Sequence, residues 1–148
     1  FDCAQISYSR YLGCRESFEA HGLTLDDSWA EACRYSMAEG YAAAGRLLDR
    51  TEGLTALFAL SDVMAIGAIR CLRDRGLRVP EDISVVGFDG VALGEYCVPR
   101  LTTIRQDTRS LVLRAAEILL GRLTEPLPPV HETVPFTVIR GESAAPLP

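Results

Sequence analysis

Short apolar runs alternate with helical segments along the chain, and this alternation constrains the fold more than any other feature. Thr55–Leu60 and Ile83–Phe88 are too short for helices and are bounded by glycine, proline or capping residues, which is typical of buried strands. Trp29–Tyr35 is predicted to be a further strand. Each run is followed by a helical pattern, and consecutive strand–helix pairs favour right-handed crossovers between parallel strands. We therefore predict an α/β fold with a parallel sheet in a Rossmann-like three-layer sandwich.

Four segments have the spacing and end signals of helices. Residues 9–21 place apolar side chains on one face before Gly22, and Ser36 precedes a second helix as its N-cap. The third helix, Val63–Arg75, follows Ser61 and Asp62, and the fourth begins at Asp107. The segment after Asp89 is predicted to be a long loop, with strands at Leu101–Ile104 and Val134–Ile139 and a frayed tail over Ser143–Pro148.

Charge and cysteine usage exclude several classes of protein. The net charge of −5 gives no basic surface for a phosphate backbone, so the chain is not expected to bind DNA by itself. No apolar run is long enough to cross a membrane, and we expect a soluble, cytoplasmic protein. The odd number and wide spacing of the cysteines predict reduced thiols and no metal site: Cys3, Cys14, Cys33, Cys71 and Cys97.

Polar side chains at the carboxyl ends of the predicted strands mark a candidate binding site. In open parallel sheets, ligands bind where these ends and the following helix N-termini converge. Tyr35, Ser61, Asp62 and Asp89 follow predicted strands, and Arg10 lies near the start of the first helix. An aromatic ring, an arginine and carboxylates suit a polyhydroxylated ligand, because the ring packs on C–H groups while the charged groups bond neighbouring hydroxyls.

Two of these residues also have a purely structural interpretation, since Asp62 can cap its own helix and Tyr35 can be a core residue. Asp89 follows an apolar strand directly and needs a partner to offset its desolvation, which favours a role in a ligand site or a hinge. Sequence motifs for nucleophilic, phosphate-binding or metal catalysis are lacking, and neither histidine has an evident nucleophile beside it. We therefore predict no enzyme activity, no catalytic residues and no cofactor.

Two stretches resemble one protein family closely. SDVMAIGAIRCLRDRGLRVPEDISVVGFDG (residues 61–90) and PRLTTIRQD (residues 99–107) are similar to the LacI/GalR repressors, and the similarity extends over nearly all of the chain. The resemblance implies a periplasmic-binding-protein-like type I fold with an effector in the cleft between two subdomains. Residues 1–104 and 136–148 would form most of the C-terminal subdomain, and 105–135 a helix and strand of the N-terminal one. The chain opens abruptly, and the DNA-binding headpiece and most of the N-terminal subdomain are expected to precede it.

The resemblance also implies functional residues. Effector contacts fall on Arg10, Tyr35, Ser61, Asp89 and Gln106. Many sugar-binding members have asparagine where this chain has Ser61, which leaves the ligand's identity open between a sugar, a purine and another effector.

The family dimerises through the C-terminal subdomain, which implies an interface on the third helix and on the loop after Asp89. The residues concerned are Met64, Ile66, Ile69, Val91, Leu93, Tyr96 and Pro99. A helix that is simply buried on several sides explains the apolar circumference of Val63–Arg75 equally well.

The resulting expectation is a homodimeric repressor region without membrane association, in which a sugar or related effector controls operator binding by the headpiece allosterically. One alternative is a periplasmic sugar-binding protein of a transporter, which shares the fold and the cleft. A second is an α/β enzyme acting on a sugar, for which Asp62 and Asp89 could be nominated as acid and base.

Overall fold

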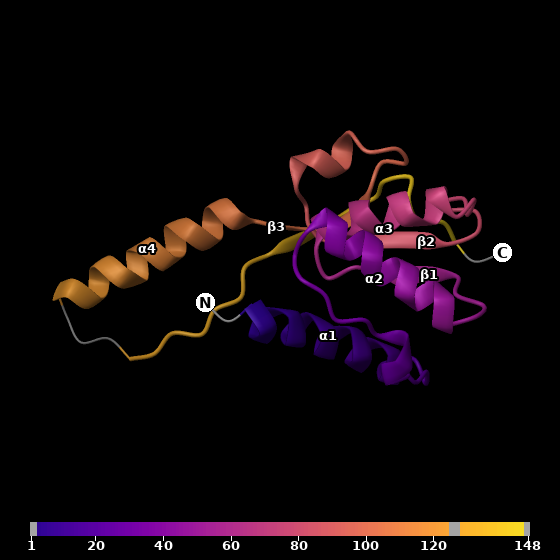
Figure 1. The fold of residues 1–148 in the computed structure, drawn as a ribbon. Coiled ribbons are helices and arrows are strands. Elements are labelled where there is room, and N and C mark those ends of the chain that lie inside the picture. The colour runs from indigo at the N-terminus through magenta and orange to yellow at the C-terminus, as the bar shows by residue number, and fades with distance from the viewer. Residues whose placement is uncertain (1–2, 125–127, 147–148) are drawn as a thin grey trace.

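A four-stranded sheet in the order β1-β2-β3-β4 forms the centre of the fold (Figure 1). The computed structural model describes residues 3–124 and 128–146. Its elements are α1 (Cys3–Ala20), the short 3-10 helix η1 (Asp27–Trp29), α2 (Met37–Arg50), β1 (Ala56–Phe58), α3 (Asp62–Asp74), β2 (Ser84–Asp89), the 3-10 helix η2 (Ala92–Glu95), β3 (Thr102–Gln106), α4 (Thr108–Thr124) and β4 (Phe136–Ile139).

The first three strands are parallel, as the alternation of strands and helices predicts. β1 pairs with β2 and β2 with β3 in parallel register. β4 runs antiparallel to β3, with Thr103 opposite Ile139, so the complete sheet is mixed. Because the three parallel strands point the same way, their carboxyl ends lie at one edge of the sheet, and this edge carries the candidate site.

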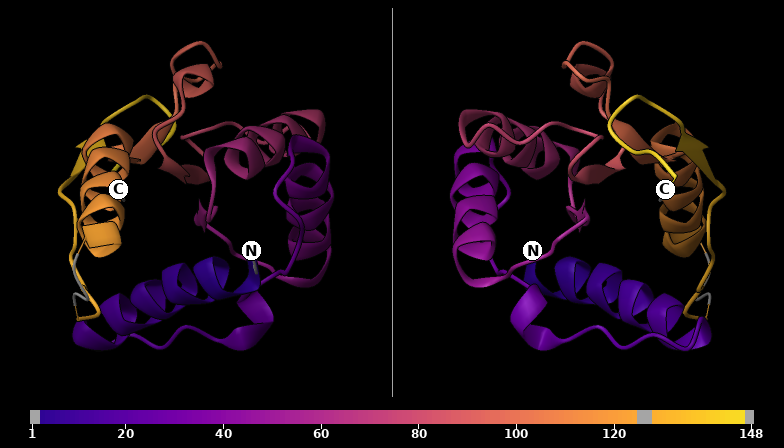
Figure 2. Two further views of the ribbon diagram at one scale, coloured as in Figure 1. Left: turned by 90° about the vertical axis from the view of Figure 1, so that its left-hand side faces the viewer. Right: turned by 90° about the vertical axis from the view of Figure 1, so that its right-hand side faces the viewer.

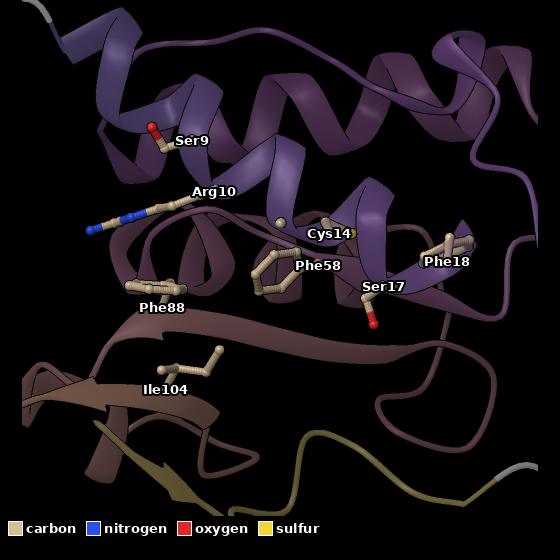
Figure 3. A pocket seen from close by; sticks show the side chains of 9 residues that line it. Ser9, Arg10, Cys14, Ser17, Phe18, Phe58, Phe88 and Ile104 are labelled. Carbon is tan, nitrogen blue, oxygen red and sulfur yellow. The ribbon is translucent and has the colours of Figure 1, made fainter. Parts of the chain in front are cut away.

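Helices flank both faces of the sheet. α3 packs on β2, and α2 packs along α3. The core lies under α3 and contains Ala65, Ile69, Leu72, Ile83, Val85 and Leu101. α1 lies across the opposite face (Figures 1 and 2), toward which Phe58, Phe88 and Ile104 point (Figure 3). The helix–sheet–helix layering follows from strands that are apolar on both faces.

α2 and α3 approach closely because each has a glycine at the contact. A Cβ atom on Gly40 would overlap the Met64 carbonyl, and one on Gly67 would overlap the Met37 carbonyl. α3 is therefore covered by the sheet on one side and by α2 on another, which accounts for its apolar circumference. Two residues predicted for a dimer interface contribute to this core: Ile69 is buried, and Ile66 packs partly buried against it.

Gly67→Ala is expected to lower the free energy of unfolding by about 1–3 kcal/mol, because the added methyl group forces two packed helices apart. Gly13→Ala is the matched control: a Cβ atom at this α1 position meets nothing within 4 Å, and alanine is the better helix former. Urea denaturation of the full-length protein measures both variants. Equal midpoints for Gly67→Ala and wild type would contradict the close packing.

The predicted strand at Trp29–Tyr35 is not formed. Trp29 ends η1, and the residues after it run along α2 without strand pairing. Arg50 at the end of α2 donates from Nε to the Ser28 carbonyl (3.0 Å) and from Nη2 to the Ala30 carbonyl (2.7 Å), and it also pairs with Glu31. No neighbouring strand among the described residues bonds this segment. The Arg50 side chain satisfies two backbone carbonyls in its place.

The tail is docked where fraying was predicted. Ser143 is fully buried, and its hydroxyl donates to the Val85 carbonyl (2.6 Å) and accepts from the Thr102 amide (2.8 Å). The Ala145 amide donates to the Ser84 hydroxyl (3.1 Å). These bonds fix the chain through Ala145; Leu147 and Pro148 lie outside the described residues.

Candidate functional site

Three of the predicted site residues meet at the carboxyl edge of the sheet. The Asp89 carboxylate at the end of β2 accepts from Arg10 Nη2 (2.8 Å) and from Gln106 Nε2 (3.1 Å). Arg10 comes from α1 and Gln106 ends β3, so residues far apart in sequence form one hydrogen-bonded cluster. The Asp89 side chain is 28% exposed and that of Arg10 is 14% exposed. The pair is thus shielded from most solvent, while the carboxylate stays accessible at one side.

Arg10 has two further contacts that the sequence did not predict. Its Nη1 donates to the Leu60 carbonyl, two residues after β1 (2.5 Å), and its guanidinium lies 4.0 Å from the centroid of the Phe88 ring. Phe88 precedes Asp89 in β2 and points to the α1 side of the sheet, as strand alternation requires (Figure 3). Side chains of successive strand residues point to opposite faces of the sheet, so the position of Phe88 in ISVVGFD could have indicated that its ring faces α1.

The backbone at Asp89 is strained. Its φ of 114° lies in a region that side-chain-bearing residues rarely adopt, and Gly90 follows with φ 73°. A Cβ atom on Gly90 would lie against the backbone and side chain of Arg105 in β3, so this turn also needs a glycine. Residues held in such conformations cost about 1–3 kcal/mol each and cluster at functional sites.

Ser61 and Asp62 lie at the start of α3, at the carboxyl edge of the sheet. Ser61 is the buried N-cap of α3, but its hydroxyl makes no capping hydrogen bond. Asp62 is the first residue of α3, after the N-cap, and it is 0% exposed. It accepts from the Val91 amide (2.7 Å) and the Thr103 hydroxyl (2.5 Å). Burial raises the pKa of Asp62, while these hydrogen bonds act in the opposite direction.

Tyr35 is half-buried directly before Ser36, whose hydroxyl accepts from the Glu39 amide as the predicted N-cap of α2. A ligand-stacking role for Tyr35 stays a prediction, as do the effector contacts assigned to Ser61 and Gln106.

A pocket of about 520 Å³ extends from Arg10 between α1 and the sheet (Figure 3). Its lining is mostly apolar and consists of Ser9, Arg10, Gly13, Cys14, Ser17, Phe18, Phe58, Phe88 and Ile104. Arg10 lines this pocket and also bonds Asp89, so the polar groups at the sheet edge adjoin a mostly apolar pocket. Such a combination is typical of small-molecule sites.

The cysteine side chains that the structure describes are free: Cys14, Cys33, Cys71 and Cys97. Burial raises the pKa of each thiol, which favours the protonated, unreactive form. The side chain of Cys3 lies outside the described side chains. Within residues 3–124 and 128–146, no group of three or more His, Cys, Asp or Glu residues is placed to hold a metal ion.

The loop after Asp89 presents apolar side chains to solvent. Tyr96 is 81% exposed, Leu93 is also exposed, and Val91 and Pro99 are half-buried. Met64 is half-buried on α3. The predicted dimer contacts on this loop and on α3 remain predictions.

Fold and site together define a ligand-binding α/β domain, and comparison with known families agrees. The family model of the periplasmic binding protein-like domain matches residues 2–144. The chain belongs to this family.

The relatives within the family are bacterial transcriptional regulators. The repressor PurR of Haemophilus influenzae is 42% identical over 116 residues, which are 78% of this chain and 34% of that protein. The CelR–cellobiose complex superposes with a TM-score of 0.87 at 35% identity, over 91% of this chain and 42% of that one. A sugar-binding LacI-family regulator from Escherichia coli, solved with phosphate, gives a TM-score of 0.82 at 31% identity, over 93% and 50% of the two chains.

These relatives confirm the resemblance to LacI/GalR effector-binding regions. The chain spans about a third of the length of the curated regulators it matches. None of the helices in the described part of the chain is long and apolar enough to cross a membrane.

Proposed function

We propose that this chain is the effector-binding and dimerisation region of a homodimeric transcriptional repressor, in which a sugar or a related polyhydroxylated molecule controls operator binding. The Arg10–Asp89–Gln106 cluster carries this proposal. It lies at the edge of the sheet where ligands of parallel α/β folds bind, and one of its carboxylate faces stays accessible.

The chemistry of the cluster suits neighbouring hydroxyl groups. The Asp89 carboxylate accepts from hydroxyls, while Arg10 and Gln106 donate to their oxygens. Phe88 lies against the Arg10 guanidinium and offers an apolar face beside these polar groups. A sugar presents both hydroxyls and C–H groups, and the arrangement provides a partner for each.

Transcriptional regulators among the relatives favour this function over transport. The relatives include a regulator solved with cellobiose, which makes a saccharide the first effector class to test. A regulator of operator DNA acts in the cytoplasm, and free, protonated thiols suit that compartment.

Residues 105–135 are assigned in this proposal to a second subdomain across the cleft. α4 extends away from the sheet (Figures 1 and 2), and none of its residues is buried. Its exposed apolar side chains need a covering surface in the complete protein: Leu111, Val112, Leu113, Leu119, Leu120 and Leu123. An effector held between the subdomains would favour one of their relative orientations and so couple to DNA binding.

A thermal-shift screen of the full-length protein tests the proposed effector class. The panel contains cellobiose, glucose, ribose, their phosphates, adenosine and hypoxanthine. A saccharide present at about 100 times its Kd is expected to stabilise the protein by about 2.7 kcal/mol. If hypoxanthine alone stabilises the protein, the effector is a purine and not a sugar. A folded protein that responds to no compound would refute effector control by small molecules of these classes.

A further inference from the structure

Asp62 is a buried carboxylate that has no direct route to a ligand. It is the first residue of α3 and is fully buried, although carboxylates are rarely placed so deep without a specific task. Both of its oxygens are used: Oδ2 accepts from the Val91 amide and Oδ1 from the Thr103 hydroxyl. A Cβ atom on Gly87 would overlap Oδ1, so β2 itself leaves room for this carboxylate.

The hydrogen bond to Val91 acts at the end of the strained turn. Asp89 and Gly90 both have positive φ, and Val91 returns to an extended conformation with φ −69°. A turn of this kind persists only when its surroundings fix it. Asp62 ties its last amide to β3 through Thr103, while Arg105 of the same strand closes against Gly90.

We infer that Asp62 is a positioning residue, which holds the Asp89–Val91 turn so that the Asp89 carboxylate faces Arg10 and Gln106. This inference rests on the proposed function of the Asp89 cluster. The sequence predicts a direct effector contact for Asp62, whereas the role inferred here is indirect. Asp62 can therefore influence ligand affinity without contacting the ligand.

The conservative variant separates positioning from direct charge recognition. Asparagine at position 62 can still accept from the Val91 amide through its carbonyl oxygen and can donate to the Thr103 hydroxyl. Asp62→Asn is therefore expected to recover most of what Asp62→Ala loses. Asp74→Ala is the matched control, because Asp74 is the carboxylate at the opposite end of α3 and pairs with Arg70 on the surface.

Two measurements on the full-length protein test the inference. The first is amide hydrogen exchange at Val91 without any effector, expected to be at least about tenfold faster in Asp62→Ala and near the wild-type rate in Asp62→Asn and Asp74→Ala. The second is the Kd of the saccharide that shifts the melting temperature most, expected to rise about 10- to 100-fold in Asp62→Ala.

Unchanged exchange at Val91, or an unchanged Kd in a folded Asp62→Ala protein, would overturn the inference. Loss of affinity in Asp62→Asn as severe as in Asp62→Ala would instead indicate direct charge recognition and would also overturn it. If Asp62→Ala does not fold, Thr103→Val releases Oδ1 alone, and an unchanged Val91 exchange rate in that variant refutes the proposed turn-holding role. Failure of every saccharide to bind wild type would refute the proposed function, whereas the exchange experiment needs no effector.

Discussion

Asp89→Ala is expected to weaken effector binding by about 30- to 150-fold in the full-length protein. The variant removes the acceptor of the cluster and leaves the largely buried Arg10 guanidinium without its ion pair. Truncation of one partner of a buried, hydrogen-bonded charge pair costs about 2–5 kcal/mol, and partial exposure of Asp89 places the loss near the lower end. Isothermal titration with the best saccharide from the thermal-shift screen measures the change.

Two further variants show whether the carboxylate itself is responsible. Asp89→Asn keeps the shape and tolerates positive φ, but it lacks the charge and should lose less affinity than alanine. Asp82→Ala removes a carboxylate before the opposite end of β2, where it pairs with Arg78 on the surface, and should leave the Kd unchanged. An Asp89→Ala protein that binds within twofold of wild type would remove Asp89 from the effector site.

Leu72→Ala is expected to have the largest effect on stability, a decrease of about 2–5 kcal/mol in the free energy of unfolding. Leu72 is a fully buried residue of α3 in one core with Ile83, Val85 and Leu101. The smaller side chain leaves a cavity where α3 meets the sheet, and closely packed neighbours cannot fill it completely.

Urea denaturation followed by circular dichroism measures this effect. Leu23→Ala is the control, because Leu23 is exposed in the segment after α1 and its loss should change stability by less than about 1 kcal/mol. A similarly small change for Leu72→Ala would mean that the core does not lie under α3.

The parallel part of the sheet could be predicted because its signals are local. The apolar runs at β1 and β2 are bounded by Gly53 and Pro80, which end regular structure irrespective of the rest of the fold. Trp29–Tyr35 shows the limit of that reasoning. A strand also needs a neighbour for its backbone, and here Arg50 takes that role from the end of α2.

The site was predictable where topology alone brings residues together. Carboxyl ends of parallel strands must meet, and so the strand pattern predicted Asp89 for the site, whereas Gln106 was predicted only from the family resemblance. The hydrogen bonds of Asp62 could not be predicted, because a capping residue and a carboxylate turned toward another strand have the same local pattern. Its partner Thr103 lies 41 positions further along the chain, and Ser143 was likewise missed because its partners are distant in sequence.

An effector bound at the Asp89 cluster is proposed to control DNA binding. The most direct measurement is the affinity of the full-length protein for the genomic DNA fragment that it selects, with and without the best saccharide. We expect the saccharide to change the affinity for DNA by about 5- to 150-fold, as usual for allosteric coupling, and we expect this change to disappear in Asp89→Ala at the same saccharide concentration. A DNA affinity that is identical with and without the bound saccharide, or a full response in Asp89→Ala, would contradict it.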